Sequence, residues 1–230
     1  MRACFFFKYV YLPTYFEVLM KSLLHPTYFT DILTAAVLAQ SENVLFEVCD
    51  NYQKQSYRNR MYIGTANGRL LLNIPVKHTG VGGHKKTADA LIENSFLWQR
   101  QHWRSLVIAY RTSPFFEFYE DDLYPLFHSE YKSLIEFNRA TMTCICELLD
   151  ITPKTDNTRE YLKDYSNSEF IDLRFLADAK RNPELGLPDY RQVFEEKNSF
   201  IPHLSVLDLI FNMGPESTSY LLGLDLKPLL

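Results

Sequence analysis

The hydrophobic and polar pattern near the start of the chain predicts a strand, a helix and a second strand in close succession. A short apolar run at 21–24 ends at a His-Pro pair, as a strand does. The Ala- and Leu-rich stretch 32–40 follows a capping residue, Thr30 or Asp31, and predicts a helix. A second apolar run at 44–48 predicts the next strand. This order is typical of a βαβ unit and indicates an α/β fold.

An Asn-Gly pair at 67–68 predicts a β-hairpin, because the runs on either side of it, 59–63 and 69–76, are rich in strand-forming residues. Alternate residues of an extended strand share a face, so this pattern places Arg58 and Arg60 on the same side of the hairpin. One face of the hairpin is therefore expected to be basic.

Helical spacing dominates the second half of the chain, where a long helix is predicted over 129–149. Ser205 is placed to cap a helix over 206–213, and Asp208 stands where a capping box has its acid. The fold class that we expect is α/β, with an N-terminal βαβ-type sheet and a β-hairpin followed by a mainly helical half.

The chain length fits one large domain, which we expect over 20–230. Within it, the polar stretch 152–169 is the best candidate for a linker-like segment. Residues 1–19 are rich in aromatic side chains and precede Met20, from which the sequence continues as a normal first strand. We expect 1–19 to be an N-terminal extension or a mis-called start.

Positive charge is concentrated in one part of an acidic protein. Residues 51–111 hold ten Lys/Arg and two acids, a formal charge of +8, whereas the whole chain carries −4. An anionic ligand is the first explanation of such a local excess. The acidic total argues against a general nucleic-acid-binding protein, which favours a basic domain.

The four cysteines match no zinc-binding spacing, and we expect them to be buried thiols in a reducing, cytoplasmic compartment. We expect no metal site, and the sequence identifies no cofactor. No apolar run reaches the roughly 18 residues of a membrane helix, so no membrane span is expected.

Six basic residues within the positive stretch are candidates for binding a phosphate or carboxylate group. Guanidinium forks bind such groups bidentately, and lysines in a glycine-bearing loop can close over a ligand. A solvated edge strand and a plain surface loop are the alternative explanations. The candidates are Lys54, Arg58, Arg60, Lys77, Lys85 and Lys86.

Three histidines, His25, His78 and His102, are candidates for general acid or base catalysis, because histidine titrates near neutral pH. His25 follows the first predicted strand, where open α/β sheets bind ligands. A structural role for His25 and a place on a helix surface for His102 are the alternatives.

Several separated blocks of the sequence form a recognisable set. They are 51–60 (NYQKQSYRNR), 66–68 (ANG), 74–78 (IPVKH), 102–103 (HW), 113–119 (SPFFEFY) and 202–212 (PHLSVLDLIFN). Together they resemble the WbqC-like family, over about residues 21–218. The family is found with bacterial O-antigen and capsule biosynthesis, which implies a place in that pathway. The resemblance supplies no catalytic residues.

The basic stretch and the resemblance together favour a group-transfer enzyme that binds a phosphorylated or nucleotide-linked sugar. Acyl or aminoacyl transfer to an amino sugar is the version that the pathway suggests. A non-catalytic binding or scaffold protein, contacting other enzymes of the pathway, is one alternative. Binding of single-stranded nucleic acid, with tyrosines of the basic stretch as stacking groups, is the other.

Overall fold

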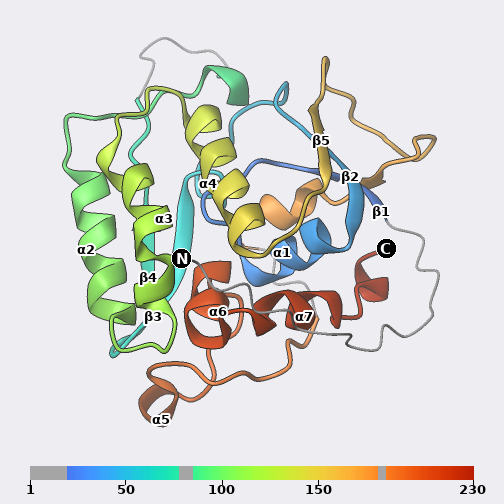
Figure 1. Ribbon diagram of the computed structural model, residues 1–230. Coiled ribbons are helices and arrows are strands. Elements are labelled where there is room, and N and C mark those ends of the chain that lie inside the picture. The colour runs from blue at the N-terminus through green and yellow to red at the C-terminus, as the bar shows by residue number, and fades with distance from the viewer. Residues whose placement is uncertain (1–19, 78–84, 181–184) are drawn as a thin grey trace, which may run out of the picture.

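A computed structural model of the chain describes residues 20–77, 85–180 and 185–230 (Figure 1). The protein has the expected α/β class, with a four-stranded parallel sheet, a two-stranded antiparallel sheet and a mainly helical second half. The proposed extension, 1–19, and most of the glycine-bearing loop, 78–84, lie outside the described residues.

The parallel sheet has the strand order β5-β2-β1-β6. Its strands are β1 (Met20–Leu24), β2 (Ser41–Phe46), β5 (Lys154–Asn157) and β6 (Ile171–Asp172). The register aligns Leu24 with Phe46, and Phe46 with Asn157. Because the strands are parallel, their carboxyl ends therefore meet along one edge of the sheet.

Helix α1 (Ile32–Ala39) connects β1 to β2, which confirms the predicted βαβ start. Asp31 is its N-cap, and the Asp31 Oδ1 atom accepts hydrogen bonds from the backbone of Leu33 at 3.0 Å and of Thr34 at 3.2 Å. The helix packs against β2 and against two C-terminal helices, α6 (Val206–Met213) and α7 (Glu216–Leu222). Since it is covered on all sides, nearly every residue of α1 is buried and apolar.

Strand β5 comes from the stretch that we expected to be linker-like. Its four residues carry polar side chains, three of them exposed, and they pair with β2 along the whole strand. A strand is recognised in a sequence by its alternating apolar side chains, and β5 has none. Residues 154–157 therefore belong to the sheet rather than to a linker.

The predicted hairpin is formed by β3 (Arg60–Thr65) and β4 (Gly68–Asn73). Gly68 has a φ of 91°, which a side chain would strain, so the turn requires glycine there. In Figure 1 helices α2 and α3 stand beside this hairpin, and α3 also packs against α4.

Ser133 caps α4 with its side chain, so the predicted long helix begins later than expected. Besides α6 and α7, the helices of this half are α2 (Trp98–Tyr110), α3 (Phe116–His128), α4 (Leu134–Leu148) and the short α5 (Glu195–Asn198). None of the helices in the described ranges is long and apolar enough to cross a membrane.

The predicted capping box at the start of α6 is wrong in one of its two residues. Ser205 does cap the helix, because its side chain accepts from the Leu207 amide at 3.3 Å. Asp208 does not complete the capping box. Its side chain is 1% exposed, and the Ser205 backbone amide, from which it would accept in a capping box, donates instead to the carbonyl of Tyr62. The Asp208 carboxylate accepts hydrogen bonds from Tyr110, Tyr190 and Gln192. Burial raises the pKa of Asp208, and these three bonds oppose the rise.

Candidate functional site

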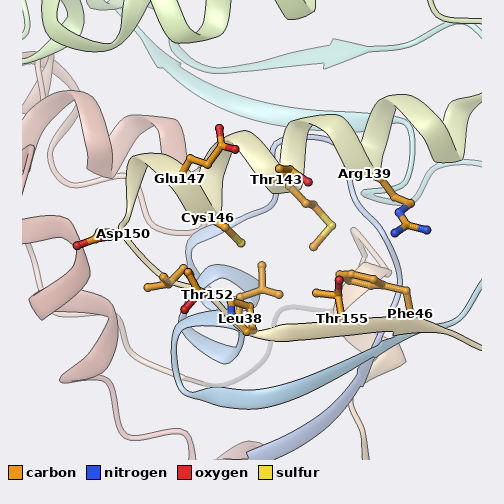
Figure 2. Close-up of a pocket in the computed structure, with 12 residues that line it drawn as sticks. Leu38, Phe46, Arg139, Thr143, Cys146, Glu147, Asp150, Thr152 and Thr155 are labelled. Atoms are coloured by element: carbon orange, nitrogen blue, oxygen red, sulfur yellow. The ribbon is translucent and has the colours of Figure 1, made fainter.

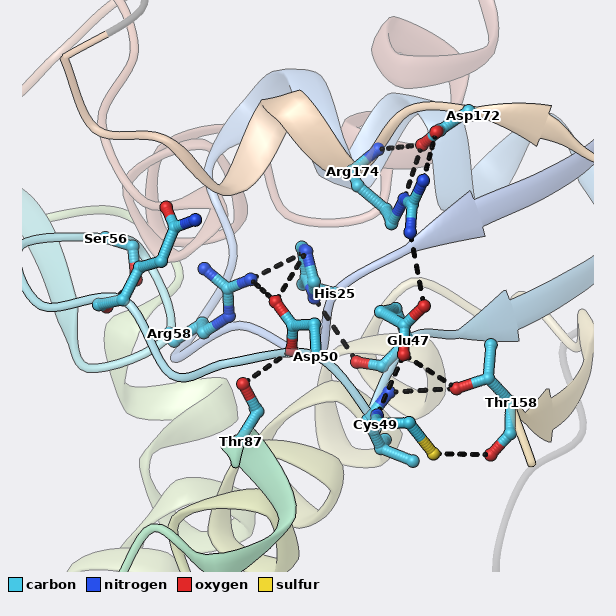
Figure 3. A network of polar contacts seen from close by, with 12 residues as sticks. His25, Glu47, Cys49, Asp50, Ser56, Arg58, Thr87, Thr158, Asp172 and Arg174 are labelled. Atoms are coloured by element: carbon cyan, nitrogen blue, oxygen red, sulfur yellow. Dashed lines mark hydrogen bonds and ion pairs between the residues drawn. The ribbon is translucent and has the colours of Figure 1, made fainter. Parts of the chain in front are cut away.

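Polar side chains gather at the carboxyl ends of the parallel strands (Figure 3). His25 follows β1, Glu47 and Asp50 follow β2, Thr158 follows β5, and Arg174 follows β6. Strands β2 and then β5 are added to the sheet on one side of β1, whereas β6 pairs with β1 on its other side, so the strand order reverses between β1 and β6. Ligands of open α/β sheets bind at this edge, at the point where the strand order reverses.

Arg58 stands at the centre of this cluster and is only 3% exposed. Its Nη2 atom donates to Asp50 Oδ2 at 2.6 Å and to His25 Nε2 at 2.7 Å. The other carboxylate oxygen of Asp50 accepts from Thr87 Oγ1 at 2.6 Å. Burial lowers the pKa of Arg58, and the charge of Asp50 opposes the fall. The Nε atom of Arg58 is buried without a partner in the described structure.

His25 is held in one tautomer by its two neighbours. Arg58 can only donate, so His25 Nε2 accepts. The proton of the ring is therefore on Nδ1, which donates a hydrogen bond to the Glu47 carbonyl at 3.2 Å. Burial, with the charge of Arg58, places the pKa of His25 well below 6.5. The ring is therefore neutral and both nitrogens are engaged. These contacts favour the structural role for His25 over catalysis.

A second ion-pair group lies beside the first. The Glu47 side chain is completely buried, and its Oε2 atom lies 3.3 Å from Arg174 Nη1. Arg174 also holds Asp172 with two parallel hydrogen bonds of 2.9 and 2.6 Å, which raise the pKa of the guanidinium. The Arg174 guanidinium further donates to the carbonyls of Leu162 and Lys163, and so ties the segment after β5 across the strand ends.

A cavity of about 600 Å³, which we call the carboxyl-end cavity, is lined by members of both groups, among them His25, Asp50, Asp172 and Arg174. Its charged lining is balanced, with three basic and three acidic side chains. The lining includes Gln53, Arg58, Tyr161, Lys163, Arg174 and Asp178.

A second cavity, of about 860 Å³, has a different lining, and we call it the basic cavity. Four of the six predicted anion-binding residues line it, together with one acid, Glu93. Those four are Lys54, Arg60, Lys77 and Lys85. Burial lowers the pKa of Lys85, and its Nζ atom donates to the carbonyl of Lys77 at 3.3 Å. The Nε atom of Arg60 is buried without a partner in the described structure.

The structure separates Arg58 from Arg60, which we expected to act together. Strand β3 begins at Arg60, so Arg58 precedes the strand and the alternation of faces does not apply to it. Arg58 lines the carboxyl-end cavity and Arg60 lines the basic cavity. Lys86 is exposed, pairs through its backbone with Asn51, and is not part of either lining.

His102 is a buried residue rather than a helix-surface residue, since it is 5% exposed. Its Nδ1 atom shares a hydrogen bond of 2.9 Å with the hydroxyl of Tyr28, and the backbone of Asn73 bonds the ring as well. Burial lowers the pKa of His102 to about 4. These contacts favour a structural role. His78 lies outside the described residues.

Sequence reasoning missed Glu47, Asp50 and Arg174. Asp50 follows the predicted strand 44–48, as His25 follows the first predicted strand, and the rule that drew attention to His25 applies equally to Asp50. Glu47 lies within that predicted strand, and it follows β2 because the strand ends at Phe46. Arg174 follows a strand of only two residues, which carries no recognisable pattern.

A third cavity, of about 520 Å³, lies between α4 and the β5 edge of the sheet (Figure 2). Leu38, Phe46 and Met142 give it apolar walls, and Arg139 reaches toward it from α4. Cys146 points into the gap, and burial raises the pKa of its thiol to about 11. This thiol is protonated at neutral pH and is a poor nucleophile. Of the predicted site residues that the structure describes, none lines this cavity.

Comparison with known proteins gives one family and one curated relative. The sequence profile described as the WbqC-like protein family matches residues 26–182. Uncharacterized protein Rv1507c of Mycobacterium tuberculosis is 29% identical over 197 residues, which cover 74% of this chain and 83% of that protein. No solved structure matches the chain.

Proposed function

The chain belongs to the WbqC-like protein family, and from this we propose that it is a cytoplasmic group-transfer enzyme of bacterial surface-polysaccharide synthesis that binds a phosphate-bearing substrate in the basic cavity. The substrate class is a phosphorylated or nucleotide-linked sugar. The pathway comes from the family's association with O-antigen and capsule synthesis. The location is supported by the free thiols of Cys49, Cys144 and Cys146, which suit a reducing compartment.

The lining of the basic cavity carries this proposal. Four basic side chains and one acid surround it, in a protein whose net charge is −4. Guanidinium and ammonium groups bind phosphate oxygens through charge-assisted hydrogen bonds. The buried Nε atom of Arg60 also has a hydrogen to donate. A bound phosphate group supplies both the negative charge and the acceptor oxygens.

The reaction that fits this pathway is acyl or aminoacyl transfer to an amino sugar. The sugar amine would attack the carbonyl carbon of an activated acyl donor and form a C–N bond. The bond to the leaving group would break with its electron pair, and the proton lost by the amine would balance the charge of that group. His25 and His102 do not line the basic cavity.

A non-catalytic binding protein of the same pathway is the second candidate. The observation in its favour is that the ring nitrogens of His25 and His102 are engaged in internal hydrogen bonds. The same phosphate-bearing ligand would then be bound and presented to other enzymes of the pathway without turnover. Incubation with acyl donors and amino-sugar nucleotides separates the candidates, because only the enzyme forms an amide product.

Single-stranded nucleic acid receives less support than a small ligand. Its stacking groups would be tyrosines of the basic stretch, but Tyr57 is 8% exposed and the Arg69 guanidinium covers the ring of Tyr62 at 4.1 Å. A labelled oligonucleotide tests this alternative, and binding that weakens steeply with salt would revive it.

A ligand panel tests the proposed function. The pure protein is heated with UDP, UDP-N-acetylglucosamine or glucose 1-phosphate, and with uridine as the uncharged control. A ligand at a hundred times its dissociation constant stabilises a protein by about 2.7 kcal/mol, which a melting curve resolves. We expect at least one phosphorylated compound to raise the melting temperature while uridine has a smaller effect. If no phosphorylated compound stabilises the protein, the proposed function is wrong.

A further inference from the structure

We propose that the carboxyl-end cavity is a second ligand site, which binds an uncharged, hydroxyl-rich ring such as a hexose. The basic cavity would hold the phosphate-bearing substrate, and the carboxyl-end cavity would hold the hexose. That the hexose takes part in the proposed reaction rests on the proposed function. The binding of a hexose does not.

The position of the cavity is the first argument. It opens at the carboxyl ends of β1 and β6, between which the order of strands reverses, and it is bordered by His25 and Arg174 from those ends. This is where open α/β sheets bind their ligands. A volume of about 600 Å³ lies within the range of small-molecule sites.

The charge balance of the lining identifies the class of ligand. Arg58 is neutralised by Asp50 at 2.6 Å, and Arg174 is neutralised by Asp172 at 2.6 Å and by Glu47 at 3.3 Å. A charged ligand would have to compete with these pairs. An uncharged ligand leaves the pairs intact and can still exchange hydrogen bonds with their outer atoms.

Polar and aromatic groups suited to a sugar ring face the same cavity. The exposed amide of Gln53 can both donate and accept, as hydroxyl groups do. Tyr161 offers an aromatic ring that is 51% exposed, and Arg174 lies 5.4 Å from its centroid and holds it in place. Ligand sites combine such aromatic walls with a few polar groups.

One short segment serves both cavities. Gln53 and Arg58 line the carboxyl-end cavity, while Lys54, Gln55 and Arg60 line the basic cavity. Gln55 has a φ of 61°, in the left-handed region, where the chain turns between the two linings. The same segment therefore presents a neutral polar wall on one side and a cationic wall on the other.

Ligand-observed NMR with the whole chain tests the inference. The probes are the uncharged sugars glucose, galactose, mannose and N-acetylglucosamine, and UDP reports separately on the basic cavity. We expect at least one sugar to bind, and Gln53→Ala and Tyr161→Ala each to weaken that binding about tenfold or more. Gln101→Ala and Tyr124→Ala are matched controls, because Gln101 is exposed on α2 and Tyr124 is 48% exposed on α3. The controls should bind as the unaltered protein does.

The outcomes separate the inference from the proposed function. If UDP binds and none of the sugars does, the second site is wrong and the anion site stands. If a sugar binds, and Arg60→Ala weakens its binding while Gln53→Ala and Tyr161→Ala do not, the sugar occupies the basic cavity and the inference is overturned. If a sugar binds with the expected dependence and UDP does not bind, the second site stands and the proposed function fails.

Discussion

The two cavities differ in how their cations are matched by acids. The carboxyl-end cavity has three basic and three acidic side chains, and its two arginines are locked in ion pairs. The basic cavity has four basic side chains and one acid. Arg60, Lys77 and Lys85 form no ion pair with another described residue.

The difference shows that an arginine's role depends on its partners more than on its neighbours in sequence. Arg58 and Arg60 are two residues apart, yet Arg58 holds together a buried cluster and Arg60 faces a cavity with an excess of positive charge. A cation whose charge is already matched contributes mainly to folding. Arg60 forms no ion pair with another described residue and remains available for a ligand.

Replacement of the two arginines tests this comparison with the largest expected effect. Arg58→Ala leaves Asp50 buried without its partner, and such losses cost about 3–5 kcal/mol of unfolding free energy. Arg60→Ala removes a partly exposed side chain and should cost less than about 1 kcal/mol. Urea denaturation measures both values. Equal losses would mean that the two arginines are not divided between folding and ligand binding.

Acid should weaken the fold through its buried histidines. The pKa of His25 lies well below 6.5 in the folded state, and that of His102 is about 4. Above pH 6.5 both are neutral in either state and add no pH dependence. As the pH falls below 6.5, the unfolded chain takes up protons that the folded chain refuses, so stability falls by about 1.4 kcal/mol per pH unit for each histidine.

Unfolding in urea at several values between pH 7.5 and pH 4.5 measures this slope. His25→Gln and His102→Gln should each make the slope shallower, because each removes one ring that titrates. The first change replaces the ring bonded to Arg58, and the second replaces the ring bonded to Tyr28. An unchanged slope in both variants would show that the two rings can be protonated within the fold.

The smallest expected effect concerns the single acid of the basic cavity. Glu93→Gln makes the lining more positive and should tighten the binding of UDP by about twofold, since exposed charges interact weakly. Glu117→Gln, at an exposed position of α3, is the matched control for net charge. Titration calorimetry measures both dissociation constants. Equal tightening by the two variants would indicate a general charge effect and not a local one.

Much of the fold was predictable because its signals are local. The βαβ start, the cap at Asp31 and the Asn-Gly hairpin each depend on a few consecutive residues and appear in the structure. Strands β5 and β6 were not predictable, because polar or very short strands lack alternating apolar residues. Their places are fixed by pairing with β2 and β1, which lie far away in the sequence.

The candidate site was only partly predictable for a related reason. Local charge density identified four residues that line one cavity. It could not show that Arg58 turns inward to Asp50, nor that Asp208 joins Tyr110 and Tyr190 in the core. Buried polar contacts join segments that are distant in sequence, and a local pattern does not contain them.

The most direct test of the anion site is a calorimetric titration of UDP into charge-matched variants. The double variant Arg60→Ala with Lys77→Ala removes two positive charges from the basic cavity. Arg100→Ala with Arg104→Ala removes two from exposed positions of α2. We predict that the first variant weakens UDP binding by about tenfold or more, at about 1.4 kcal/mol per factor of ten, and that the second leaves it within about twofold. Equal weakening in both variants, or none in the first, would contradict an anion site in the basic cavity.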